Sequence, residues 1–321
     1  MRSAIPSGVV RLLVVLGVLT AAMAGADDDL LMDLKNAKQR ATQQTYQLKY
    51  QFRPGETIRY EVVQLTATNT RVGGILDKVT NRPTEVFDKA QTRSISTKVW
   101  KVVDVNDEGH ATFVHMVEDV DMWSHLAGHK EMRYNSKTDA KPPKGYESVA
   151  KNLGNPLTTV TIDSTGKVIK RVDKKGYSGI KGEQIVDRVP PQPVRIGDQW
   201  YCPHEIIVAD NDRRFHRIKT RKLYRLDKVS AGVATIHVKT QVLTPIRSPA
   251  IEAKLVKWLT EGDLKFDLDA GRVVALELNL DKKVMGFAGP NSCMEYLSRR
   301  TEKLLPAEQQ TAQRKEAELP R

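Results

Sequence analysis

Apolar side chains in this chain recur mainly at every second position, a period that is typical of half-buried β-strands. Between Tyr46 and Phe52, apolar and polar residues alternate without a break. Pro54 and Gly55 then favour a turn, because proline fixes φ and glycine accepts a positive φ at the next position. The alternation resumes at Ile58, so we predict that the two runs form an antiparallel hairpin.

One longer hairpin pattern occurs twice along the chain. In the first copy Val99–Val105 leads to a turn that ends at Gly109, and in the second copy Leu223–Val229 leads to Gly232. Each glycine begins the same Gly-x-Ala-Thr motif, and each copy opens on a threonine at the same distance from its glycine. The corresponding residues are Thr97 with Thr220 and Trp100 with Tyr224. This echo indicates an internal duplication.

The similarity continues beyond these hairpins. Helical spacing predicts short helices at residues 146–153 and 251–259, and each precedes a strand, a turn and a second strand. The two final turns contain Gly166 and Gly271. Residues 190–193 read Pro-Pro-Gln-Pro and predict a linker between the copies, because proline cannot donate to a β-ladder.

The whole pattern predicts a mainly β, antiparallel fold. Two pseudo-repeated, hairpin-rich units would form a curved sheet, an open barrel or a sandwich, with a few short helices. Sequential strands joined by short turns pair antiparallel, and the helices are too few for the crossovers of a parallel sheet. The predicted division is a signal peptide at 1–24, a polar leader or short helix at 25–45, unit 1 at 46–189, unit 2 at 190–305 and a polar tail at 306–321.

The N-terminus has the three parts of a secretory signal peptide. Arg2 and Arg11 are followed by an uncharged apolar run, which ends before Asp27–Asp29, and Ala22–Ala24 supplies a small-x-small cleavage pattern. The run is shorter than the roughly 20 apolar residues that a spanning helix needs. We expect a periplasmic or extracellular protein without a transmembrane segment in its mature part; an uncleaved N-terminal anchor is the alternative.

The composition adds a basic excess, with 51 Lys and Arg against 39 Asp and Glu and a formal net charge of +12. Such an excess favours anionic partners such as envelope polymers or lipid head groups, and an exported protein is not expected to meet nucleic acid. Basic residues gather on one candidate strand, where alternate side chains share a face. The candidate anion-binding residues are Arg213, Arg217, Lys219, Arg221 and Arg225. A solvated strand face without a ligand is the alternative.

Four of the seven histidines lie between His110 and His129. His125 and His129 are spaced to share one face of a helix, where they could bind zinc with Glu131 or Asp121 as a third ligand. Exposed histidines after a strand are the alternative, because the surrounding residues do not favour a helix. Phosphate-binding loops, nucleophile elbows and Cys-x-x-Cys pairs are absent from the sequence, so no catalytic residue and no cofactor is predicted.

The redox state of the two cysteines, Cys202 and Cys293, would depend on whether the chain is exported. A disulfide persists in an oxidising compartment, and closing so long a loop would restrict the unfolded chain by about 4 to 5 kcal/mol. Two separate buried thiols are the alternative, because pairing cannot be read from a sequence.

Three turn segments carry a resemblance to a known group of proteins. They are the motif Gly-Asp-Gln-Trp-Tyr that begins at Gly197, the paired Gly-x-Ala-Thr hairpins, and residues 266–273. In these the chain resembles the uncharacterised exported β-rich proteins of planctomycete-type bacteria, over residues 46–305. The resemblance implies an envelope location, and it supplies no catalytic residues because its motifs are structural turns.

Together these patterns predict a non-enzymatic envelope protein that binds either an apolar, lipid-like ligand on the concave face of its sheet or an anionic polymer on the basic strand. One alternative is a metal-dependent hydrolase that uses the His110–His129 region, and another is a structural envelope protein. A carrier requires a deep apolar cavity. A hydrolase requires convergent ligands or a nucleophile–base pair in a cleft.

Overall fold

The computed structural model describes residues 44–76, 82–174, 186–210 and 212–306. The predicted signal peptide, nearly all of the predicted leader and nearly all of the predicted tail lie outside these ranges. The chain divides into two compact units, Met1–Tyr46 and Gln47–Arg321. In the first unit the structure describes strand β1 (Thr45–Tyr46).

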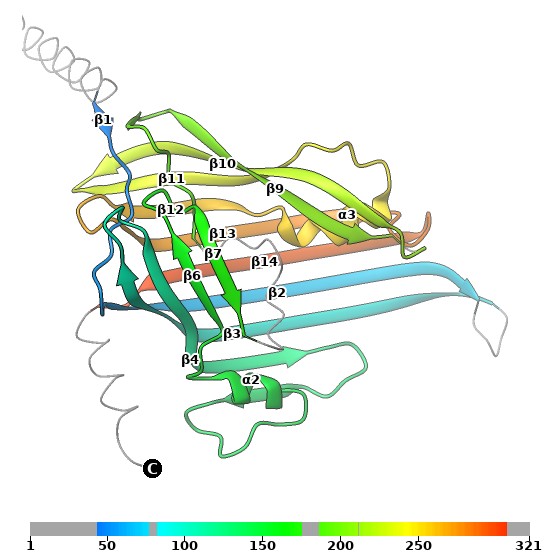
Figure 1. Cartoon of the computed structure of the whole chain (residues 1–321). Coiled ribbons are helices and arrows are strands. Elements are labelled where there is room, and N and C mark those ends of the chain that lie inside the picture. Colours follow the sequence, from blue (N-terminus) through cyan, green and yellow to red (C-terminus); the bar gives the residue numbers. More distant parts are fainter. Residues whose placement is uncertain (1–43, 77–81, 175–185, 211, 307–321) are drawn as a thin grey trace, which may run out of the picture. The chain divides into compact units, whose positions relative to one another are not determined.

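The second unit is built on one twelve-stranded antiparallel sheet, which confirms the predicted mainly β fold. Its strands are β2 (Thr57–Leu76), β3 (Pro83–Val105), β4 (Ala111–His125), β5 (Met132–Asn135), β6 (Thr158–Ile162), β7 (Val168–Asp173), β9 (Gln199–Ala209), β10 (Phe215–Ser230), β11 (Val233–Val242), β12 (Glu261–Asp267), β13 (Arg272–Met285) and β14 (Ser292–Leu304). Their order is β7-β6-β4-β3-β2-β14-β13-β12-β11-β10-β9, with β5 also paired to β4. The sheet curves strongly without closing into a barrel, because no ladder joins the described strands β7 and β9 (Figure 1).

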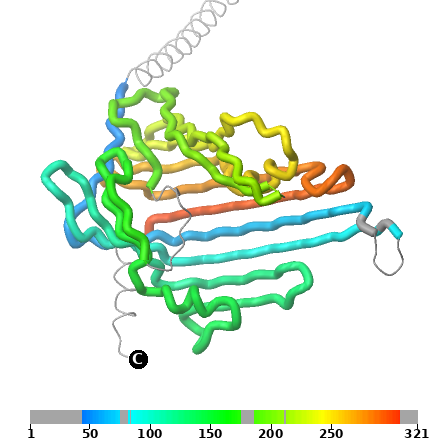
Figure 2. Tube along the Cα trace, turned by 45° about the vertical axis from the view of Figure 1, so that its right-hand side comes forward, coloured from blue at the N-terminus to red at the C-terminus, as the bar shows by residue number. Residues whose placement is uncertain are grey.

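Each half of the sheet is a run of sequential neighbours, as the duplicated sequence pattern predicts. Strands β2 to β7 follow one another on one side, and β13 back to β9 do so on the other. Strand β14 pairs with both β13 and β2 and so joins the halves into one sheet; Figure 2 shows red β14 beside blue β2. Thr97, Thr220, Trp100 and Tyr224 are all buried, but Thr97 lies at a register shift of the β3–β4 ladder, whereas Thr220 pairs directly with Val242.

Alternation along these strands gives the sheet an apolar inner face and a charged outer face. One row of directly paired residues crosses four strands on the inner face: Leu226, Ile236, Leu264 and Leu276. The row beside it on the outer face is Arg225, His237, Asp263 and Glu277. Each inner aliphatic side chain contributes about 1.5 to 3 kcal/mol by burial, so the register of these strands is strongly specified.

The two short helices form where helical spacing predicts them. They are α2 (Glu147–Asn152) and α3 (Pro249–Leu255), which continues as the 3-10 turn η1 (Val256–Trp258). Leu255 packs on Ile206, Val208 and Ile218, while Val256 packs on Leu280, Val284 and Met294. Therefore α3 and η1 cover inner-face residues from both β9–β10 and β13–β14. No helix in the described part of the chain is long and apolar enough to cross a membrane.

The predicted hairpin around Pro54 is wrong in its first arm. Residues 47–52 are extended but belong to no strand, although Leu48 and Tyr50 are buried as the alternation predicts. Their backbone bonds go elsewhere: Tyr50 N–H donates to the Ser164 carbonyl at 2.8 Å, and Gln51 N–H donates to the Gly271 carbonyl at 2.9 Å. The segment thus crosses the final turns of both halves. A period of two in the sequence indicates that one face of an extended segment is buried. It does not indicate which strand, if any, the segment pairs with.

One glycine marks a close approach between strands β12 and β13. A Cβ on Gly262 would lie 1.9 Å from the Glu277 carbonyl oxygen, so the backbone would have to shift. We expect Gly262→Ala to destabilise the fold by about 1 to 3 kcal/mol, measured by urea unfolding. The matched control is Gly73→Ala, where a Cβ would meet no atom closer than 3.3 Å. Equal effects of the two substitutions would contradict the close approach.

Candidate ligand-binding pocket

A cavity of about 350 Å³ lies on the inner face of the sheet and takes residues from both halves. We call it the inner pocket. Strands β2 and β3 contribute Tyr60, Gln64, Lys98 and Trp100; β9 to β12 contribute His204, Ile206, Thr220, Lys222, Thr240 and the adjoining Thr260; β13 and β14 contribute Val273, Leu276, Leu278, Tyr296, Ser298, Arg300 and Glu302. Lys257 and Trp258 of η1 complete the lining together with Tyr50, Val186 and Asp187. The pocket therefore exists only because the sheet curves.

The inner loop, residues 186–189, holds the two halves together beside the pocket. The Asp187 carboxylate accepts hydrogen bonds from the Tyr224 hydroxyl at 2.9 Å and from Lys222 at 3.1 Å. The Tyr50 hydroxyl donates to the Asp187 carbonyl at 2.9 Å, and Trp200 Nε1–H donates to the Arg188 carbonyl at 2.9 Å. These bonds fix one wall of the pocket without a regular secondary structure.

A buried ion cluster occupies the floor of the pocket. Glu302 forms ion pairs with both Lys98 and Arg300, and its side chain is only 9% exposed. The Lys98 ammonium also lies 5.0 Å from the Tyr60 ring centre and 5.2 Å from that of Trp100. Burial alone would raise the pKa of Glu302, but Lys98 and Arg300 outweigh it and lower that pKa to about 2.

Burial also sets the protonation of the uncharged groups near the pocket. It raises the pKa of Tyr50 and Tyr224, and the Asp187 carboxylate raises both further, so these phenols remain hydrogen-bond donors. Burial lowers the pKa of His204, helped by Lys222. It lowers the pKa of His115 to about 4, helped by Lys98. Both imidazoles are therefore neutral at neutral pH.

The lining as a whole combines an apolar surface with an excess of positive charge. Its cations are Lys98, Lys222, Lys257 and Arg300, and its carboxylates are Glu302 and Asp187. Glu302 and Asp187 pair with three of these cations, whereas Lys257 lies over the Trp258 ring at 5.3 Å. Such a lining can hold an apolar body and pair with a negatively charged end.

The predicted histidine metal site does not have the geometry that suggested it. His125 ends β4, and His129 lies in a turn in which its N–H donates to the Leu126 carbonyl at 3.0 Å, so no helix places them on one face. Within β4, His115 and His125 are separated by ten steps of about 3.3 Å, roughly 33 Å in all. The extended strand therefore keeps His115 and His125 apart, and within the described ranges neither His125 nor His129 belongs to a group of three possible metal ligands.

The predicted basic stripe lies on the outer face of β10, away from the inner pocket. Its neighbours in sequence, Ile218 and Tyr224, are buried, as alternation requires. The stripe comprises Arg213, just before the strand, and Arg217, Lys219, Arg221 and Arg225. Arg217 pairs with Glu205 at 3.3 Å and Arg225 with Asp227 at 2.5 Å, so part of its charge is neutralised.

The possible disulfide is not formed. Cys202 lies on β9 and Cys293 on β14, and four strands separate these two strands in the sheet, so no disulfide joins them. Cys293 is buried and Cys202 is partly exposed. Of the two alternatives, the structure has the separate thiols.

Sequence reasoning missed the charged residues of the pocket. Lys98 and Trp100 share one phase of β3, and Arg300 and Glu302 share one phase of β14. The sequence did contain a signal for them. These charged side chains lie on the same strand face as buried aromatic residues, whereas regular alternation would place charged residues on the solvent face. Their convergence depends on the pairing of β14 with β2, which no local pattern gives.

Comparisons with known proteins do not identify a family for this chain. No family model matches it, and no curated protein matches it. A solved structure described as lipid–protein interactions in lipovitellin resembles it with a TM-score of 0.42 and 11% identity. The match covers 80% of this chain and 26% of that chain. A likeness this distant identifies neither a family nor a ligand.

Proposed function

We propose that this chain is an exported binding protein that holds a small amphipathic anion in the inner pocket. The observation that carries the proposal is a cavity lined by both aliphatic and cationic side chains on the concave face of the sheet. The apolar part of the ligand lies against Ile206, Leu276 and Leu278, and its charged end lies near the basic side chains. The proposed ligand therefore combines, in one site, the apolar character and the negative charge that the sequence predicted for two alternative ligands.

Size and charge both support the proposal. Small-molecule pockets typically measure about 300 to 1,000 Å³, are lined mostly by apolar groups and contain a few polar groups that orient the ligand. The inner pocket, at about 350 Å³, lies at the lower end of this range. Lys257 is an exposed cation at the lining of the pocket and lies over the Trp258 ring, so a charge-assisted contact with it would favour an anionic ligand over a neutral one.

The rival functions receive less support from the same residues. A hydrolase that uses the His110–His129 region needs convergent ligands, and among the described residues none of these histidines belongs to a group of three possible ligands. A polymer site on β10 needs free cations, and Arg217 and Arg225 already have carboxylate partners. A purely structural role gives no reason for a cationic cavity.

Location and family belong to the same proposal. We place the protein outside the cytoplasm, in the periplasm or beyond, because basic residues, an apolar run and a small-x-small pattern open the sequence. We assign it to the exported β-rich proteins of planctomycete-type bacteria because its turn motifs resemble theirs. Export with a tagged secretion reporter and recovery in the periplasmic fraction tests the first statement.

Decanoate should bind the purified protein with one site in isothermal titration calorimetry, below the concentration at which it forms micelles. Decyltrimethylammonium, which has the same chain and the opposite charge, should not bind measurably. We expect Lys257→Ala to weaken decanoate binding about tenfold, because one charge-assisted contact is lost.

The matched control is Lys265→Ala, which removes an exposed lysine from β12, outside the pocket. It should leave the dissociation constant unchanged. Equal binding of decanoate and decyltrimethylammonium would contradict the proposal, and so would the absence of decanoate binding by the wild-type protein.

A further inference from the structure

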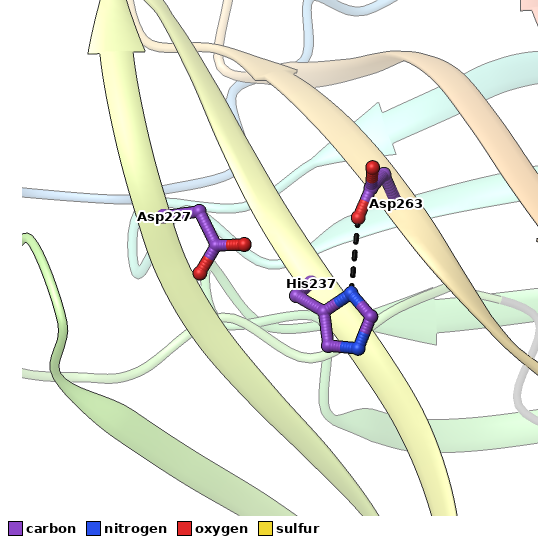
Figure 3. A group of neighbouring side chains, drawn as sticks. All are labelled: Asp227, His237 and Asp263. Carbon is purple, nitrogen blue, oxygen red and sulfur yellow. Dashed lines mark hydrogen bonds and ion pairs between the residues drawn. The ribbon is translucent and has the colours of Figure 1, made fainter.

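A group of metal-ligating side chains lies on the outer face of the sheet, apart from the inner pocket. Asp227, His237 and Asp263 come from the neighbouring strands β10, β11 and β12, and one ligand atom of each lies within 4.8 Å of the others. Figure 3 shows the three side chains on the same face of these strands. His237 is partly buried and the two aspartates are exposed.

The strand register creates this group. His237 and Asp263 are directly paired between β11 and β12, so their side chains lie next to each other. The β10–β11 register shifts between Leu226 and Lys228, which makes Asp227 the extra residue of a β-bulge. Bulges redirect side chains, and this one adds a carboxylate beside the imidazole.

The two nitrogens of His237 have different surroundings. Nδ1 lies 3.1 Å from Oδ1 of Asp263, on the side of the three-residue group, and Nε2 lies 3.1 Å from Oε1 of Glu261. A histidine that binds a metal through one nitrogen usually donates its other N–H to a carboxylate, which fixes the tautomer and the ring orientation. Glu261 occupies that position and is itself paired with Lys239 at 2.7 Å.

We propose that Nδ1 of His237 and the carboxylates of Asp227 and Asp263 bind one divalent first-row transition-metal cation of the Zn²⁺ type, with Glu261 as the positioning residue. One nitrogen and two carboxylate donors suit zinc and its neighbours, whereas calcium takes six to eight oxygen ligands. Water completes the coordination, because the site faces solvent. Small rotations of the two exposed aspartates bring the donors to about 2.0 to 2.2 Å from the metal.

Asp227 and Glu261 each have a basic partner that orients the carboxylate. Asp227 accepts two hydrogen bonds from Arg225, at 2.5 and 3.2 Å, and Glu261 contacts Lys239. The basic stripe of β10 therefore has a second role here, because Arg225 holds one of the proposed ligands. The buried inner-face residues of the same strands separate this site from the pocket, so the two proposals succeed or fail independently.

The test is calorimetric titration of the untagged, chelator-treated full chain with zinc chloride. We expect one zinc per chain and no binding of magnesium or calcium at the same concentrations. His237→Asn should abolish binding, and Asp263→Asn should weaken it at least about tenfold. Glu261→Gln should weaken it about tenfold to a hundredfold by loss of the oriented N–H contact.

The matched control is His216→Asn. His216 pairs with Asp210 at 2.8 Å on the same half of the sheet, but it belongs to no group of three ligands among the described residues. This variant should bind zinc like the wild type, and so should Cys202→Ser, which removes the partly exposed thiol. Zinc binding that survives His237→Asn, or a wild-type chain that binds no zinc, would overturn the proposal and leave His237 as an ion-pair partner of its carboxylates.

Discussion

Replacement of Glu302 by glutamine should destabilise the fold by about 3 to 5 kcal/mol, although the side chain keeps its size. The substitution leaves Lys98, whose side chain is 14% exposed, as a buried cation without its carboxylate partner. Arg300 loses the same partner. The Tyr60 and Trp100 rings near Lys98 attract the ammonium too weakly to replace an anion. Urea unfolding at neutral pH measures the effect.

The control lies on the same strand. Glu295 pairs with Lys283 at 3.0 Å, but their side chains are 51% and 58% exposed, so Glu295→Gln should cost at most about 1 kcal/mol. The double substitution Lys98→Met with Glu302→Leu should recover most of the stability, because the buried cation is removed together with its partner and only Arg300, whose side chain is 35% exposed, loses its contact with Glu302. If Glu302→Gln and Glu295→Gln had equal effects, the ion cluster would not be buried as described.

Features that depend on neighbouring residues could be predicted from the sequence. The repeated hairpins follow from alternation and from Gly109 and Gly232 in their turns, where both glycines have positive φ. The helices α2 and α3 follow from helical spacing. Alternation also gives the correct face for the stripe on β10. Each of these needs information from a few residues on either side.

Features that depend on long-range pairing could not be predicted. Strand β14 pairs with β2, which lies more than 200 residues earlier in the chain, and this pairing makes one sheet from two halves. The pocket charges meet only through it, since Lys98 and Glu302 are separated by 204 residues. The group around His237 needs both the register of three strands and a bulge at Asp227, and neither is visible as a period in the sequence.

The same distinction explains the error at residues 47–52. The alternation there is correct, because Leu48 and Tyr50 face the core, but the backbone partners Ser164 and Gly271 are far away in sequence. Local pattern identifies the buried side of an extended segment. The segment's place in the fold depends on which distant turns it meets.

Acid should remove stability in two successive ranges of pH. His115 has a folded pKa of about 4 against an ordinary 6.5, and Glu302 has about 2 against 4.5. Both values are lowered by folding, so each contribution is fully present above the ordinary pKa and is lost as the pH falls through the folded pKa. Each amounts to about 3 kcal/mol, lost between pH 6.5 and 4 for His115 and between pH 4.5 and 2 for Glu302.

Urea unfolding across this pH range, compared between variants, separates the two contributions from the general titration of surface carboxylates. His115→Asn should remove the upper range and keep the lower one, and Glu302→Gln should do the reverse. Burial causes the first effect, since it disfavours the charged imidazole, whereas Lys98 and Arg300 cause the second by favouring the charged carboxylate. If the three proteins lost stability in parallel between pH 6.5 and 2, neither group would have the environment that the curved sheet gives it.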